Sequence, residues 1–252
     1  MSVLVERRGA VLVMTIDRPA QRNAVNRAVS LALANALDTL DADPALRVGI
    51  VTGAGGNFCS GMDLKAFVEG ERPELEGRGF AGVTETPPEK PLIAAVEGFA
   101  LAGGCELALA CDLIVASDGA MFGLPEVTRG LVAGSGGLVR LRERIPPAIA
   151  LEYALTGARM NAATAHRWGL VNRLAEAGKA LEQAQELATL IAANAPLSVL
   201  ASKRIMAAAA DWPLDQRWER QRAMVEAVLA SDDAQEGARA FAEKRLPVWR
   251  GQ

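Results

Sequence analysis

Short apolar runs that end at glycine or proline alternate along this chain with segments whose apolar residues follow helical spacing. Residues 11–16 form a β-branched run that ends at Asp17-Arg18-Pro19, where proline prevents further strand pairing. Apolar positions then share one helical face from residue 27 to about residue 40. Further buried strands are predicted at residues 48–52, 92–96 and 113–116. This alternation of strand, glycine turn and helix predicts an α/β fold whose strands lie between layers.

The pattern becomes mainly helical after residue 134. Pro146-Pro147 predicts a helix that runs to about residue 155, and Asn161 is expected to cap the next, at residues 162–168. A last short strand is expected at residues 170–174. Amphipathic helices are predicted at about 179–193, 197–210, 214–230 and 232–245. We therefore expect an α/β core at residues 1–195 and a helical region at 196–252, packed on the core or on a neighbouring subunit.

Residues 69–90 interrupt the pattern with charges, glycines and three prolines. This composition predicts a mobile loop or a short, loosely held helix. Such segments on rigid scaffolds often line binding sites.

Composition excludes several classes of partner. Half of the 252 residues are hydrophobic, and the net charge of −3 argues against nucleic acid or an anionic membrane surface as a partner. The most membrane-like stretch, residues 91–116, contains Glu97, Glu106 and Asp112, which makes it a poor spanning helix. The N-terminus shows no signal-peptide pattern. We expect a soluble protein without a membrane partner.

The cysteines favour a reducing compartment. Cys59, Cys105 and Cys111 form neither a CxxC pair nor a disulfide framework. No basic neighbour that would activate a thiol is evident in the sequence, so they are expected to pack in the core. A cytoplasmic location follows from this pattern.

The first phrase with candidate chemistry is Gly103-Gly104-Cys105-Glu106, followed by strong helix formers. It predicts a turn at a helix N-terminus, where unpaired N–H groups and the helix dipole stabilise a developing oxyanion. Glu106 is then a candidate acid or base. The alternative is glycine-mediated helix packing, with Glu106 only favouring its own helix dipole.

Two further phrases complete an ordered set. In residues 58–64, the backbone N–H near Met62 is a second candidate donor; the alternative is a tight turn capped by Asp63. In Phe122-Gly-Leu-Pro-Glu126, the proline fixes the chain direction just before a carboxyl group. A glutamate that faces water is the alternative for Glu126.

Other chemistries find little support. The four glycines of residues 130–137 form neither a GxGxxG after a strand nor a phosphate-binding loop. His166, the only histidine, lies near a predicted helix end, so a zinc site or a Ser-His-Asp triad is difficult to assemble. We expect no metal and no separate cofactor, and we expect carboxylates and backbone to do any chemistry.

The ordered phrases resemble the enoyl-CoA hydratase/isomerase family, the crotonases. The resemblance covers residues 17–245 and is most specific in the middle third. Residues 99–106 and 165–172 are most similar to a branch that includes the carnitinyl-CoA dehydratases. The resemblance implies a spiral core of repeated ββα units, a C-terminal helical trimerisation region, and a homotrimer or a dimer of trimers.

The resemblance also implies roles for individual residues. Oxyanion donors would be the N–H groups of Met62 and Gly103, and the catalytic carboxyls would be Glu106 and Glu126. Contacts with CoA or substrate would fall on Arg22, Ala24, Ser60, Asp63, Leu64, Phe241 and Lys244, the last two from a neighbouring helix. CoA would enter as part of an acyl-CoA substrate.

These roles lead to a hypothesis of reversible water addition across the C2–C3 double bond of a 2-enoyl-CoA. Retention of both glutamates favours hydration or its reverse. One alternative is Δ3-Δ2 enoyl-CoA isomerisation with Glu126 as the proton shuttle. Another is an acyl-CoA-binding protein without catalytic activity.

Overall fold

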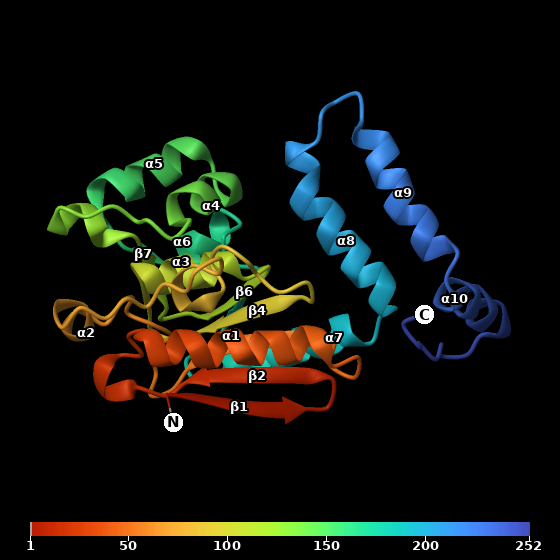
Figure 1. Cartoon of the computed structure of the whole chain (residues 1–252), viewed down its shortest axis with the longest axis horizontal. Coiled ribbons are helices and arrows are strands. Elements are labelled where there is room, and N and C mark those ends of the chain that lie inside the picture. Colours follow the sequence, from red (N-terminus) through yellow and green to blue (C-terminus); the bar gives the residue numbers. More distant parts are fainter. Residues whose placement is uncertain (1) are drawn as a thin grey trace.

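A six-stranded sheet forms the centre of the protein in a computed structural model that describes residues 2–252 (Figure 1). Its order is β1-β2-β3-β4-β6-β9. Strand β1 pairs antiparallel with β2, and the other pairs are parallel. The strands are β1 (Val3–Arg8), β2 (Val11–Ile16), β3 (Val48–Gly53), β4 (Leu92–Val96), β6 (Leu113–Ser117) and β9 (Arg173–Ala175).

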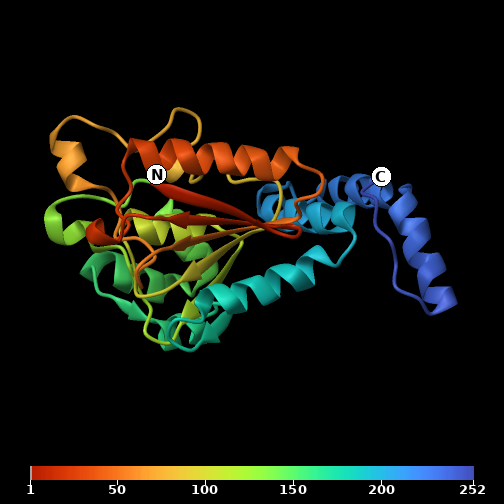
Figure 2. The ribbon, with the colours of Figure 1, turned by 90° about the horizontal axis from the view of Figure 1, so that it is seen from below.

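Helices cover both faces of this sheet because alternate apolar residues of its strands point to opposite sides. Leu12, Met14 and Ile16 of β2 belong to the larger core, together with the apolar face of α1 (Arg27–Ala42). Val11 and Val13 belong to a second cluster that packs against α7 (Ala180–Ala192). Figure 2 shows α1 and α7 on opposite sides of the sheet.

A smaller sheet lies beside the large one, in the order β5-β7-β8. Its strands are β5 (Phe99–Leu101), β7 (Met121–Gly123) and β8 (Met160–Asn161). Strand β5 leads into α3 (Gly103–Ala110), in which all residues are buried. The other helices and turns before residue 173 are η1 (Pro19–Gln21), α2 (Leu64–Val68), η2 (Phe80–Gly82), η3 (Pro125–Arg129), α4 (Gly137–Arg144), α5 (Pro147–Thr156) and α6 (Ala162–Arg167).

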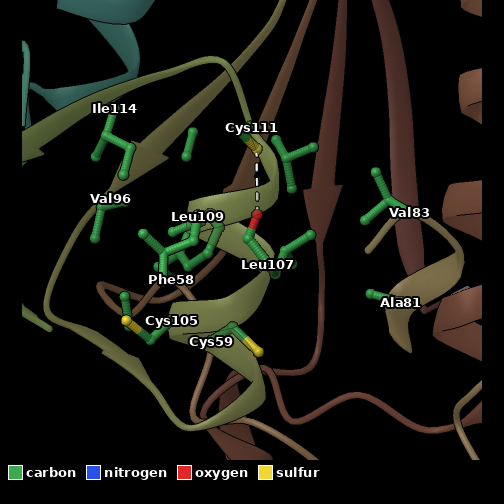
Figure 3. Packing of buried hydrophobic residues seen from close by; sticks show 14 of the residues in the cluster. Phe58, Cys59, Ala81, Val83, Val96, Cys105, Leu107, Leu109, Cys111 and Ile114 are labelled. Carbon is green, nitrogen blue, oxygen red and sulfur yellow. Dashed lines mark hydrogen bonds between the residues drawn. The ribbon is translucent and has the colours of Figure 1, made fainter. Parts of the chain in front are cut away.

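The three cysteines pack in the core, as predicted, and they lie in or near α3. Cys59, Cys105 and Cys111 are free and buried (Figure 3). Burial raises the pKa of each thiol to about 12, so all three stay neutral. The Cys111 thiol donates to the Leu107 carbonyl within the core. Their role is packing.

The C-terminal helices α8 (Pro196–Ala208), α9 (Arg217–Leu229) and α10 (Asp232–Glu243) extend away from the sheet, with the short turn η4 (Ala209–Asp211) after α8 (Figure 1). Every residue of α8 and α9 is at least partly exposed. Lys203 of α8 ties this region to the core through an ion pair of 2.6 Å with Asp112. Within residues 2–252, no helix has the length and apolar character needed to cross a membrane.

Most predicted elements are confirmed, including the strand at residues 92–96 and the Asn161 cap, which accepts from the Thr164 N–H. The strand expected at residues 170–174 is wrong in position. Leu170 and Val171 are buried in the turn after α6, and β9 begins only at Arg173. Residues 69–90 follow an irregular path, but the predicted loose packing is wrong for residues 80–84, which are buried.

Candidate active site

The phrase around Met62 lies against the start of α3 because it pairs with β5. The Cys59 N–H donates to Phe99 at 2.8 Å, and the Leu101 N–H donates back to Cys59 at 3.0 Å. Strand β5 then turns directly into α3. A Cβ atom placed on Gly61 would lie 3.2 Å from the Gly103 nitrogen. The two glycine turns that are far apart in sequence therefore meet.

Both expected oxyanion donors are unpaired in this arrangement. The neighbours of Met62 are held by Val25, whose N–H donates to Gly61 and whose carbonyl accepts from Asp63. The Met62 N–H itself has no acceptor within residues 2–252. Gly103 is the first residue of α3, so its N–H has no partner within the helix. These two N–H groups are available to a ligand.

Ala102 stands at the strained turn before α3. Its φ of 51° and ψ of −129° are unusual for a residue with a side chain. The turn joins β5 to α3 and sets the direction of the Gly103 N–H. Such strain is often found where backbone groups are arranged for function.

Glu106 lies in the first turn of α3 with a side chain that is almost fully enclosed, at 3% exposure. Its Oε1 accepts from the Ser135 N–H at 2.7 Å and from the Gly137 N–H at 3.0 Å. Burial raises the pKa of Glu106, and this effect outweighs the opposing influence of these donors and of the Arg140 charge. The carboxyl group is fixed in place and binds a proton more readily than in water.

Glu126 follows Pro125 in η3 and is half-buried. Its Oε2 is enclosed and has no hydrogen-bond partner within residues 2–252. Burial raises the pKa of Glu126, and the negative charge of Glu106 raises it further. The charges of the two carboxyls therefore interact. The alternative that Glu126 only faces water is not consistent with its enclosed Oε2.

Residues 22–24 and 60–64, where CoA contacts are expected, are joined by backbone hydrogen bonds. The Ser60 N–H donates to the Arg22 carbonyl at 3.0 Å, and the Ser60 hydroxyl donates to Gln21. Arg22 is exposed, whereas Ala24 is buried. Leu64 begins α2 and is exposed.

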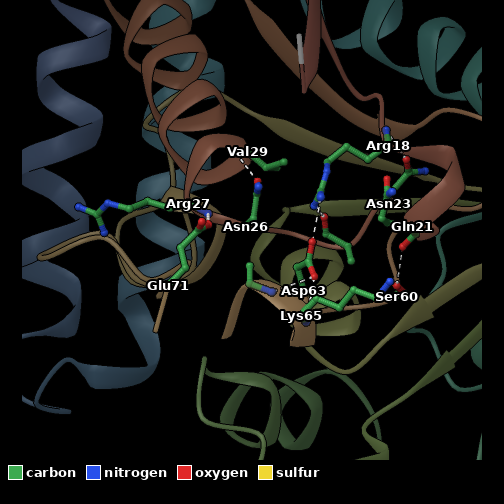
Figure 4. A network of polar contacts seen from close by, with 12 residues as sticks. Arg18, Gln21, Asn23, Asn26, Arg27, Val29, Ser60, Asp63, Lys65 and Glu71 are labelled. Atoms are coloured by element: carbon green, nitrogen blue, oxygen red, sulfur yellow. Dashed lines mark hydrogen bonds and ion pairs between the residues drawn. The ribbon is translucent and has the colours of Figure 1, made fainter. Parts of the chain in front are cut away.

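Arg18 connects these two segments (Figure 4). Its guanidinium donates to the Ala24 carbonyl at 2.5 Å and pairs with the Asp63 carboxylate at 2.8 Å. The other Asp63 oxygen caps α2 by accepting from Lys65 and Ala66. Burial would raise the pKa of Asp63, but the hydrogen bond from Arg18 and the cap outweigh it, so the pKa is lowered. Asp63 thus serves both as the predicted cap and as an anchor beside Met62.

Phe241 and Lys244 are not brought to this site within the single chain. Phe241 is 88% exposed on α10, and Lys244 is the exposed C-cap of that helix. Figure 1 shows α10 on the far side of the molecule from α3.

Sequence reasoning missed the residues that hold Glu106. In the sequence, the glycine-rich residues 130–137 were considered only as a nucleotide-binding loop, for which there was no support. Their turn in fact supplies the N–H groups of Ser135 and Gly137 that donate to Glu106. The only signal in the sequence was the glycine at position 137. The structure gives the reason for it, because a Cβ on Gly137 would lie 2.8 Å from the Glu106 Cγ. The close approach of two segments requires glycine there.

Arg18→Met is expected to lower the free energy of unfolding by about 3 kcal/mol, because it leaves a mostly buried carboxylate without its partner. The side chains of Arg18 and Asp63 are only 18% and 12% exposed. Urea denaturation would measure this. The control is Arg7→Met, which removes the exposed Arg7–Asp43 pair and should cost less than about 1 kcal/mol. Equal losses in both variants would contradict the anchoring role.

This site combines unpaired backbone N–H groups with two carboxyls whose charges interact, on an α/β scaffold. Such a combination is typical of an enzyme that transfers protons next to a carbonyl group. The sequence profile of the enoyl-CoA hydratase/isomerase family matches residues 6–252. The chain belongs to this family, the crotonases.

Relatives extend over the whole chain. The carnitinyl-CoA dehydratase of Proteus mirabilis is 47% identical, with 97% of each chain covered. The crystal structure of an enoyl-CoA hydratase from Mycobacterium marinum is 60% identical, with a TM-score of 0.98 and coverage of 100% of this chain and 99% of that one. A carnitinyl-CoA hydratase structure from Mycobacterium avium is 49% identical, with a TM-score of 0.80 and the same coverage.

These similarities confirm the predicted family and the crotonase fold. The protein is a hydro-lyase of the crotonase family that acts on a CoA thioester. An acyl-CoA is therefore its substrate class.

Proposed function

We propose that the protein catalyses reversible addition of water across the C2–C3 double bond of a 2-enoyl-CoA. The observation that carries this proposal is the pair formed by Glu106 and Glu126, two carboxyls whose pKa values are both raised by burial and which interact by charge. Hydration needs one group to activate water and another to deliver a proton, and this pair offers both.

In the proposed reaction, the thioester oxygen accepts hydrogen bonds from the N–H groups of Met62 and Gly103. Attack of water at C3 moves negative charge onto this oxygen. Donors that are already aimed at the oxyanion stabilise the enolate-like state without reorganisation. Loss of one such donor typically costs about 10²–10³ in rate.

Glu106 is assigned to the water. Two backbone N–H groups hold its Oε1, so its other oxygen, Oε2, is the one assigned to orient and deprotonate water. Glu126 is assigned to the proton at C2. Each transfer contributes roughly 10²–10⁴ in rate. Two interacting carboxyls titrate as a pair, and one proton is retained while the other group is ionised.

CoA is proposed to bind along Arg22, Ala24, Ser60, Asp63 and Leu64. Because Asp63 is already committed to Arg18 and α2, it would act by positioning the loop.

Phe241 and Lys244 are proposed to reach the site of a neighbouring subunit, with residues 196–252 as the helical association region of a trimer or a dimer of trimers. The exposed apolar side chains of this region support that proposal, among them Met206, Leu214, Trp218, Leu229 and Phe241.

The test is an assay of crotonyl-CoA and carnitinyl-CoA, followed through the absorbance of the conjugated thioester. Hydration predicts loss of enoyl absorbance from crotonyl-CoA and incorporation of heavy oxygen from labelled water. The carnitinyl thioester belongs in the panel because two of the compared relatives carry that name. A 3-enoyl-CoA that moves its double bond without taking up label would favour the isomerase instead. Tight CoA binding without turnover of any thioester would favour a binding protein.

A further inference from the structure

Arg140 of α4 joins two segments that are far apart in sequence, one of which holds the Glu106 carboxyl. Its guanidinium donates to the Thr84 carbonyl, in the buried part of the irregular segment 69–90. It also donates to the Ser135 carbonyl at 3.4 Å. The N–H of the same Ser135 donates to Glu106 at 2.7 Å. A chain of contacts thus runs from residues 80–84 through Arg140 to the carboxyl assigned to water.

The turn that holds Glu106 is shaped around the Arg140 side chain. A Cβ on Gly136 would lie 2.2 Å from an Arg140 nitrogen, and Gly136 has a φ of 89°. The guanidinium therefore occupies the space beside the turn, and the backbone there adopts a left-handed conformation that favours glycine. Removal of the side chain would leave this turn without its support.

The charge of Arg140 is not neutralised by an ion pair with any residue that the structure describes. Its positive charge lowers the pKa of the Glu106 carboxyl, against the larger effect of burial. Among the other elements packed against α3, β5 and η2 contain no charged residue. Glu126 and Arg129 of η3 are charged as well, and the pKa of Glu126 responds to both Glu106 and Arg129. Arg144 of α4 is directed to the Cys111 carbonyl instead.

We propose that Arg140 is a positioning residue for the water-addition step. By bridging Thr84 and Ser135, it keeps the backbone donors of Glu106 in place and links them to the buried residues 80–84. This inference depends on the proposed function for its kinetic part. It assigns Arg140 no contact with substrate.

Substitutions can separate the bridge from the charge. Arg140→Lys keeps a positive charge but cannot span both carbonyls with a planar fork. Arg140→Met removes both. Arg142→Met is the matched control, because Arg142 lies on the same helix, is exposed and makes no contact with Glu106. It also accounts for any effect of net charge on CoA binding.

For Arg140→Met, kcat with crotonyl-CoA is expected to fall by about 10–10²-fold, since a small misplacement of a catalytic group has effects of this size. KM should change by less than about threefold, because ground-state binding is retained. The acidic limb of the pH profile of kcat/KM should move to higher pH. In Arg140→Lys, kcat should fall while the acidic limb stays near that of wild type. The inference would be overturned if Arg140→Met had the same kcat and the same pH profile of kcat/KM as Arg142→Met.

A second measurement does not require turnover. The Glu106 carboxyl can be titrated by carbon NMR in protein labelled at glutamate, with its signal assigned through Glu106→Gln. A higher Glu106 pKa in folded Arg140→Met than in Arg142→Met is expected, and equal values would overturn the inference. If the two variants differ in this way but the wild-type protein hydrates no enoyl thioester, only the proposed function is refuted. If Arg140→Met does not fold, Arg140→Gln serves in both measurements.

Discussion

Glu106→Gln is expected to reduce kcat for hydration of crotonyl-CoA by about 10²–10⁴-fold while the protein stays folded. The amide has the same shape as the carboxyl group, and its oxygen can still accept from the N–H groups of Ser135 and Gly137. It cannot take a proton from water. Steady-state kinetics and circular dichroism of the purified variant would measure both parts of this prediction.

A suitable control for Glu106→Gln is Glu152→Gln, because Glu152 is exposed on α5. It should retain wild-type kinetics. The pH dependence provides a further check: the negative charge of Glu106 raises the pKa of Glu126, so the Glu126 pKa should fall when Glu106 becomes neutral. Wild-type turnover by Glu106→Gln would remove Glu106 from the mechanism.

Glu126→Gln is expected to reduce the same rate by about 10²–10⁴-fold, through loss of the proton at C2. In deuterated water, the wild-type enzyme should place deuterium at C2 of the product, and the variant should do so at a correspondingly lower rate. Mass spectrometry of the product would measure this. Exchange at the wild-type rate in Glu126→Gln, with Glu152→Gln again as the control, would show that another group handles this proton.

The same substitution should not weaken the fold at neutral pH. The pKa of Glu126 is higher in the folded protein than in the unfolded chain, so its contribution to stability is fully present below the pKa that Glu126 has in the unfolded chain. That contribution is lost as the pH rises through the folded pKa. Thermal unfolding from acidic to neutral pH should therefore show the wild type losing stability relative to Glu126→Gln as pH increases. Such a gain in stability with a loss of activity is common at active sites.

Much of the large sheet could be predicted from sequence because buried parallel strands are continuous apolar runs. Strands β2, β3 and β4 are such runs. Helix α1 could also be predicted, because its apolar residues recur with helical spacing. The small sheet was not predicted. Its strands have only two or three residues, too few to show a period, and they are stabilised by pairing with segments distant in sequence.

The candidate site was predictable in its side chains and not in its backbone. Glu106 and Glu126 stand out because each lies in a glycine-bearing phrase and the phrases form an ordered set, although each phrase alone also has a structural interpretation. The donors to Glu106 come from Ser135 and Gly137, and a backbone N–H is present in nearly every residue type. Arg140 gave no signal either, because its partners are two carbonyls.

The sequence by itself determined where most strands and helices form, which glutamates are candidates for proton transfer, and which family the chain resembles. Tertiary structure alone decided that the Glu126 Oε2 is enclosed without a partner, and that Glu106 is held by a turn some thirty residues further along the chain. Local patterns specify local structure through propensity and periodicity. A pKa depends instead on burial and on charges that the fold brings close, and a free N–H depends on which segments pack against it. Neither can be read from the neighbouring residues in the sequence.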